Sequence, residues 1–102
     1  QTRSFCYILD MVDGIAKAML AKDTLGEIIN LGNPHEQTVL ELADLIKKLT
    51  GSNSKISYEG LPEDDPVRRK PDITKAKRLL SWEPKVGIEE GLAKTIQYLK
   101  TI

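Results

Sequence analysis

Apolar positions recur along the chain with two different periods, which predict short strands alternating with helices. Residues 3–9 are rich in aromatic and branched side chains and predict a strand. Asp10 then predicts the N-cap of a helix over 11–20. The apolar face of that helix is made by Met11, Ile15, Ala18 and Met19. Gly26 ends this segment, and residues 27–32 predict a second strand.

The next helix carries the clearest boundary signals. Thr38 and Glu41 have capping-box spacing, in which each side chain satisfies a backbone N–H at the helix start. Gly51 supplies the C-terminal stop. The apolar stripe between them consists of Val39, Leu42, Ala43, Ile46 and Leu49. A short third strand is predicted over 55–60.

Residues 60–71 contain three prolines and predict a loop. Asp72 predicts the cap of a third helix, and a fourth helix follows the Trp82-Glu83-Pro84 sequence. The inward positions of these two helices are Ile73, Ala76, Leu79 and Leu80, and then Ile88, Leu92, Ile96 and Leu99. We expect Ile46, Leu49, Leu92 and Ile96 to be core residues.

This order, β-α-β-α-β-loop-α-α, predicts a small α/β lobe with three short strands and four helices. The length of 102 residues is that of one domain, so residues 1–102 are expected to form one unit.

Composition narrows the function classes. The formal net charge is zero, so no overall field draws the chain to nucleic acid or to a membrane surface. No apolar run is long enough to cross a bilayer. The single cysteine, Cys6, is expected to be a small buried apolar residue, and the single histidine, His35, a surface turn residue. Neither residue has further Cys or His residues near it in the sequence that could complete the ligand set of a metal site.

Motifs for turnover are absent from the sequence. No GxGxxG follows a predicted strand, and no GxxxxGK[ST] is present, so neither a dinucleotide fingerprint nor a P-loop occurs. No tyrosine has a lysine four residues later. Residues 1–102 alone therefore offer no machinery for catalysis.

Arginine stands at two places that could bind an anion. Arg3 opens a predicted strand, and Arg68 and Arg69 lie between Pro66 and Pro71. A guanidinium presents a flat fork of donors that matches a phosphate or a carboxylate, and stiff backbone lowers the cost of ordering it. Solvated surface charge is the plainer interpretation. Because carboxylates occupy the same loop, an anion that also carries hydroxyl groups, such as a sugar phosphate, fits better than nucleic acid.

Several segments together resemble a known family. They are QTRSFCYILDMVDG at 1–14, INLGNP at 29–34, TVLELADLIKKLTG at 38–51 and DDPVRRKPDITKAKRLLSWEPKVGIEEGL at 64–92. They resemble the C-terminal substrate-binding lobe of the extended short-chain dehydrogenases, the NAD-dependent epimerase/dehydratase family. The QTRSF and DDPxxRKPD sequences are most like its UDP-glucuronate decarboxylase branch, which makes UDP-xylose.

The resemblance implies a fragment of a longer enzyme, without the Rossmann half that binds NAD and carries the catalytic tyrosine and lysine. In the family reaction the sugar is oxidised at C4, loses CO2 and is reduced again. The lobe would bind UDP-glucuronate. By similarity, Arg3 contacts the diphosphate and Arg69 lies near the diphosphate and sugar with a supporting role in catalysis. Gln1 and Asp65 are further candidates for UDP or ribose contacts.

The resemblance further implies a homodimeric parent, a soluble cytoplasmic location and an apolar edge toward the missing half. A lumenal parent with an upstream anchor is the alternative location. Two other functions stay open. The first is the same lobe of a dTDP-glucose 4,6-dehydratase or a UDP-sugar 4-epimerase. The second is a binding module that has no catalytic role.

Overall fold

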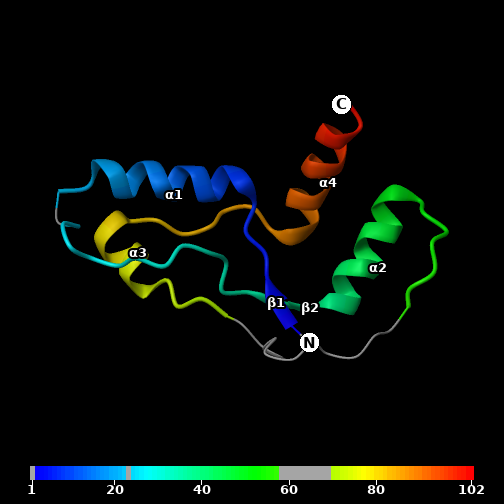
Figure 1. Cartoon of the computed structure of the whole chain (residues 1–102), viewed down its shortest axis with the longest axis horizontal. Coiled ribbons are helices and arrows are strands. Elements are labelled where there is room, and N and C mark those ends of the chain that lie inside the picture. Colours follow the sequence, from blue (N-terminus) through cyan, green and yellow to red (C-terminus); the bar gives the residue numbers. More distant parts are fainter. Residues whose placement is uncertain (1, 23, 58–69) are drawn as a thin grey trace.

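The structure, a computed structural model, describes residues 2–22, 24–57 and 70–102. These residues form four helices and a two-stranded sheet, the α/β class that the sequence predicts. In chain order the elements are β1 (Thr2–Ser4), α1 (Ile8–Leu20), β2 (Glu36–Thr38), α2 (Val39–Thr50), α3 (Thr74–Leu80) and α4 (Ile88–Leu99). The molecule is elongated, 50 × 36 × 20 Å, with α1 and α3 at one end and α2 and α4 at the other (Figure 1).

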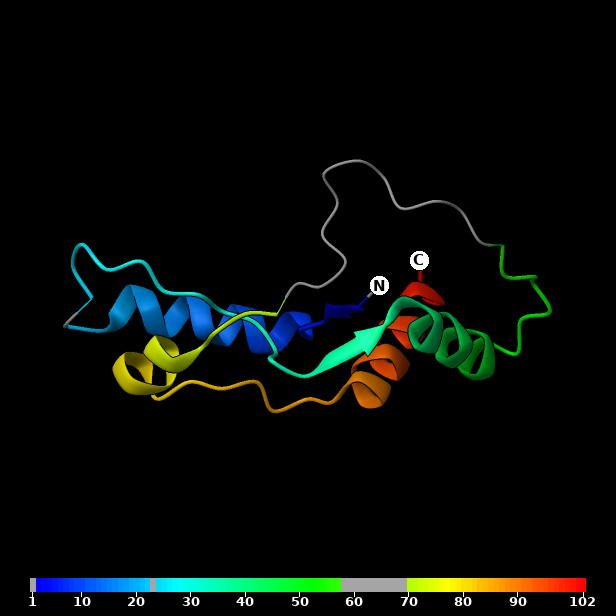
Figure 2. The same ribbon diagram turned by 90° about the horizontal axis from the view of Figure 1, so that it is seen from below.

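The sheet connects the two ends of the molecule (Figure 2). β1 and β2 pair antiparallel, with Arg3 opposite Gln37 and Ser4 opposite Glu36. The Thr2 hydroxyl donates to a Glu36 carboxylate oxygen at 2.9 Å, across the same pair of strands. Because β2 runs directly into α2, this pairing also fixes the direction in which α2 leaves the sheet.

The core lies at the end formed by α1 and α3. Four side chains are buried there: Ile73, Ala76, Leu80 and Trp82. Trp82 is 1% exposed and packs against α1 at Gly14, where an added Cβ would stand 3.0 Å from the Trp82 Cε2 atom. Glycine is therefore needed at this position to let the indole approach the helix.

The helices α2 and α4 pack less completely. The predicted core positions Ile46, Leu49, Leu92 and Ile96 are not buried: Ile46 is 38% exposed and the other three are half-buried. The prediction that these four residues form the core is wrong. Their stripe is amphipathic, as the periodicity indicates, but the described residues do not cover it.

Elements specified by local signals are confirmed. α2 has both hydrogen bonds of the capping box between Thr38 and Glu41, and Gly51 ends it with a φ of 68°. α4 begins at Ile88, and its first turn contains Glu89 and Glu90, where the helix dipole favours negative charge.

The predicted strands are mostly wrong. The first is restricted to Thr2–Ser4, because residues 8 and 9 already belong to α1. Residues 27–32 form no strand, and neither do residues 55–57, while residues 58–60 lie outside the described residues. The strand that pairs with β1 is β2, over Glu36–Thr38, which the polar sequence Glu-Gln-Thr did not indicate.

Candidate functional site

Arg3 is the one predicted site residue that the described part of the chain contains. It occupies the middle position of β1, opposite Gln37, and is half-buried. Its guanidinium Nη1 donates to the Thr2 carbonyl oxygen at 2.7 Å. The sheet pairing therefore fixes the backbone from which the guanidinium projects. Gln1, Asp65 and Arg69 lie outside the described residues, as does Arg68.

The chain that follows Arg69 is anchored to the segment that enters β2. Pro71 packs on Gly32, where an added Cβ would stand 3.0 Å from the Pro71 Cγ atom. Lys70, Pro71 and Pro34 line a shallow hollow of about 370 Å³, which Lys77 also borders. Because Pro34 stands just before β2 and β2 pairs with β1, the contact of Pro71 with Gly32 and the strand of Arg3 belong to one connected part of the fold.

Asp72 serves the start of α3, as expected, although the cap residue itself is Ile73. Its carboxylate accepts hydrogen bonds from the Thr74 hydroxyl at 2.6 Å and the Thr74 backbone N–H at 3.0 Å. These two bonds, the hydroxyl first, lower the pKa of Asp72. The carboxylate is therefore engaged in the local structure at the start of α3.

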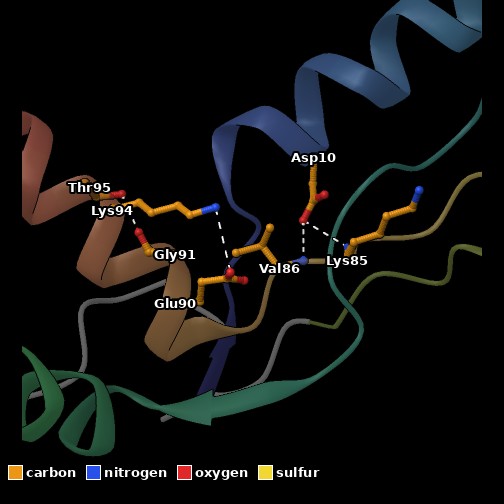
Figure 3. A network of polar contacts seen from close by, with 7 residues as sticks. All are labelled: Asp10, Lys85, Val86, Glu90, Gly91, Lys94 and Thr95. Carbon is orange, nitrogen blue, oxygen red and sulfur yellow. Dashed lines mark hydrogen bonds and ion pairs between the residues drawn. The ribbon is translucent and has the colours of Figure 1, made fainter.

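A buried carboxylate that the sequence did not reveal connects the two ends of the molecule. Asp10 was predicted to be the N-cap of α1, and that prediction is wrong. The residue lies inside α1 and is 8% exposed. Its Oδ2 accepts the backbone N–H groups of Val86 at 2.9 Å and Lys85 at 3.1 Å (Figure 3). Its carbonyl oxygen accepts the Trp82 indole N–H at 3.0 Å. No local signal could have indicated this, because the partners are more than 70 residues away in the chain.

Cys6 lies beside this network and packs partly against the core, in a half-buried position. Burial raises the pKa of the Cys6 thiol, and the negative charge of Asp10 adds to the effect. A raised thiol pKa disfavours the reactive thiolate. The interpretation of Cys6 as a small apolar residue therefore fits better than a catalytic role. His35 is exposed, as expected.

A second hollow does not suit an anionic ligand. It measures about 830 Å³ and lies between α2, α4 and residues 5–9. Its lining is mainly apolar and aromatic, including Phe5, Tyr7, Leu42, Ile46, Leu92 and Tyr98. The one charged group in it, Lys94, pairs with Glu90 at 3.7 Å (Figure 3). The same ammonium stands 5.7 Å from the centre of the Tyr7 ring. Large apolar pockets are common ligand sites, but this one lacks the converging polar groups that would orient a nucleotide sugar.

Two further kinds of site find no support in the described residues. No cluster of His, Cys, Asp and Glu side chains there could hold a metal ion. Within the same residues, the helices are too short or too polar to span a bilayer.

No protein-family model matches the chain. Individual proteins do. The sequence is 53% identical over 98 residues to UDP-glucuronic acid decarboxylase 1 of Danio rerio, a match that covers 96% of this chain and 23% of that protein. UDP-glucuronic acid decarboxylase 5 of Arabidopsis thaliana is also 53% identical, over 92 residues, and the match covers 90% of this chain and 26% of that protein. The chain therefore spans about a quarter of the length of these relatives.

Solved structures show the same lobe. The UDP-glucuronic acid 4-epimerase of Bacillus cereus, in complex with UDP-glucuronic acid and NAD, superposes with a TM-score of 0.89 at 30% identity. The match covers 99% of this chain and 32% of that chain. The resemblance to the NAD-dependent epimerase/dehydratase family, and to UDP-glucuronate decarboxylases in particular, is thereby confirmed.

Proposed function

We propose that this chain is the nucleotide-sugar-binding lobe of an NAD-dependent UDP-glucuronate decarboxylase. In this proposal, a part of the enzyme outside residues 1–102 forms the dinucleotide-binding half. The observation that carries the proposal is the 53% identity, over 96% of the chain, to a protein named for that activity. Identity to the solved UDP-glucuronic acid 4-epimerase is 30%, although its fold agrees closely. A UDP-sugar 4-epimerase is therefore the second candidate.

The role of the lobe in this proposal is to hold the anionic part of UDP-glucuronate. Arg3 would contact the diphosphate from β1, where the pairing with β2 holds its backbone in register. Arg69 would contact the diphosphate and the sugar and support catalysis. Bidentate contacts from a guanidinium to phosphate are stronger and more directional than contacts from an ammonium. Gln1 and Asp65 are proposed for UDP or ribose contacts.

NAD would supply reversible oxidation at the sugar, and the proposal gives this chain no contact with it. The sequence contains no glycine-rich dinucleotide fingerprint, and the one charged group of the apolar hollow, Lys94, is paired with Glu90. We also propose, from the family resemblance, that the parent enzyme is a cytoplasmic homodimer. Sedimentation of the parent and its localisation in cells test those two statements.

The test of the proposed site uses a chimera in which residues 1–102 replace the matched segment of the Danio rerio decarboxylase. Arg69→Lys and Arg3→Lys are compared with Arg68→Lys, which has the same charge change and no assigned ligand. Loss of a planar, charge-assisted contact should lower kcat/KM for UDP-glucuronate and the affinity for UDP by about tenfold or more at Arg69 and Arg3. Arg68→Lys should stay near the unsubstituted chimera.

Equal small effects at all three arginines, in chimeras that stay folded, would contradict the proposed site. The arginines would then be solvated surface charges.

A further inference from the structure

The paired strands β1 and β2, which lie side by side in Figure 1, use one face of their sheet for contacts within the fold. Residues directly opposite each other on antiparallel strands point to the same face, and successive residues along a strand alternate between faces. Thr2, Ser4, Glu36 and Thr38 therefore share one face. On this face the Thr2 hydroxyl donates to the Glu36 carboxylate at 2.9 Å, and the Thr38 hydroxyl accepts the Glu41 backbone N–H at 3.0 Å. These contacts hold the sheet together and begin α2.

The opposite face of the two strands carries Arg3 and Gln37, which stand directly across from each other. Side chains in this relation have Cβ atoms about 4.5–5.5 Å apart. The Arg3 guanidinium donates to the Thr2 carbonyl oxygen at 2.7 Å, so it stays close to its own strand. The shorter Gln37 side chain can therefore present its amide beside the guanidinium.

The Gln37 amide takes no part in the contacts that hold the described residues together. No residue in the described part of the chain forms a hydrogen bond with that amide, whereas the neighbouring Glu36 and Thr38 both have side-chain partners. The Gln37 side chain is half-buried, and its polar atoms are not shut off from solvent. A side-chain amide carries two N–H donors and no charge, so it can share an anion with a guanidinium without repelling it.

We infer that Gln37 is a second diphosphate ligand, whose amide N–H groups donate to the anion that Arg3 binds. This inference rests on the proposed function, because that proposal places the diphosphate of UDP-glucuronate at Arg3. The guanidinium supplies the charge, and the amide adds a directional donor from the other strand. Because the pairing of β1 with β2 sets the distance between the two backbones, less ordering is needed when the ligand binds.

The test measures affinity for UDP and for uridine by calorimetry in the Danio rerio chimera. Gln37→Met keeps the length of the side chain and removes its donors. It should weaken UDP binding about tenfold, because a hydrogen bond to a charged group is lost. Gln37→Glu should weaken UDP binding about a hundredfold, because it also places a negative charge beside the diphosphate. Uridine has no diphosphate, so its affinity should not change in either variant.

The matched controls are Gln97→Met and Gln97→Glu, which make the same chemical changes at an exposed position on α4. Both should bind UDP as the unsubstituted chimera does, and urea titration of each variant checks that the fold is kept. Arg3→Lys is the reference for the proposed site. In an Arg3→Lys background, Gln37→Met should still weaken UDP binding, because the amide contacts the diphosphate itself.

The inference is overturned if Gln37→Met leaves UDP affinity unchanged, or if it lowers the affinities for UDP and uridine alike. It is also overturned if Gln37→Met has no effect in the Arg3→Lys background, because Gln37 would then act only by holding the guanidinium. An unchanged UDP affinity in Gln37→Met beside a loss in Arg3→Lys would remove this inference and leave the proposed function in place. Unchanged affinity in both variants would contradict the proposed site as well.

Discussion

Both ends of the molecule contain amphipathic helices, but among the described residues a buried core forms at the α1–α3 end and not at the α2–α4 end. At the α1–α3 end, Ile73, Ala76, Leu80 and Trp82 form a closed core, and Trp82 is 1% exposed. At the α2–α4 end, the corresponding stripes line an open hollow of about 830 Å³, and Leu99 is 55% exposed. An apolar stripe thus shows that a helix packs on something, but not whether the partner lies within the same 102 residues.

The connection between the two ends is polar. Asp10 receives the Lys85 and Val86 backbone N–H groups on the segment that leads from the core to α4. A buried carboxylate with these partners orients the segment, whereas apolar packing holds the core itself. The comparison therefore predicts the size of the loss in unfolding free energy. Substitutions in the core should cost most, those at Asp10 less, and those on the open apolar stripe of α2 and α4 least.

Trp82→Ala should have the largest effect. Removing a buried indole leaves a cavity and removes the indole N–H that the Asp10 carbonyl oxygen accepts, so the free energy of unfolding should fall by about 3–5 kcal/mol. Ile46→Ala at the open end is the comparison variant. Since Ile46 is 38% exposed, it should cost less than about 1 kcal/mol. Urea titration measures both, and equal losses would show that the two ends are packed alike.

Asp10→Ala should rank second. It leaves two backbone N–H groups with no acceptor, and losing hydrogen bonds to a charged group should cost about 2–4 kcal/mol. Asp10→Asn retains one oxygen and should lose less. The control is Asp13→Ala, which removes an exposed carboxylate from the same helix. If Asp10→Ala lowers the unfolding free energy no more than this control does, the connecting role of Asp10 is refuted.

Thr38→Ala, at the start of α2, should have the smallest effect of the three. Loss of a threonine N-cap typically costs about 1 kcal/mol. The Thr38 hydroxyl and backbone bonds lower the pKa of Glu41 below its usual 4.5, so this carboxylate stabilises the fold above that pH and its contribution disappears as the pH falls through the lowered pKa. In Thr38→Ala the Glu41 pKa, followed by carboxyl NMR, should rise toward 4.5. An unchanged pKa would mean that the capping box does not persist in solution.

The contrast between α2 and Asp10 explains how much of the fold the sequence could predict. Both ends of α2 were predictable, because the signals are local. Thr38 and Glu41 bond to each other within the first turn, and Gly51 directly follows the last residue of the helix. The role of Asp10 was not, because its acceptor bonds go to residues 75 and 76 positions away. Residues 27–32 were predicted as a strand from their residue types, but a strand also needs a partner, which the local sequence cannot supply.

The candidate site divides in the same way. The arginine-bearing segments were recognisable from their residue types and their resemblance to a family. The pairing of Arg3 with Gln37 and the packing of Pro71 against Gly32 could not be predicted, because both are contacts between distant parts of the chain.

Conversion of UDP-glucuronate to UDP-xylose and CO2 in the presence of NAD⁺ is the measurement that tests the account most directly. It is made on the isolated 102-residue chain and on the Danio rerio chimera that contains it. We predict product from the chimera and none from the isolated chain above a buffer control, because the proposed function gives the lobe the binding of the sugar nucleotide and places the reacting groups elsewhere. Turnover by the isolated chain, or a folded chimera that binds NAD but makes no UDP-xylose, would contradict the account.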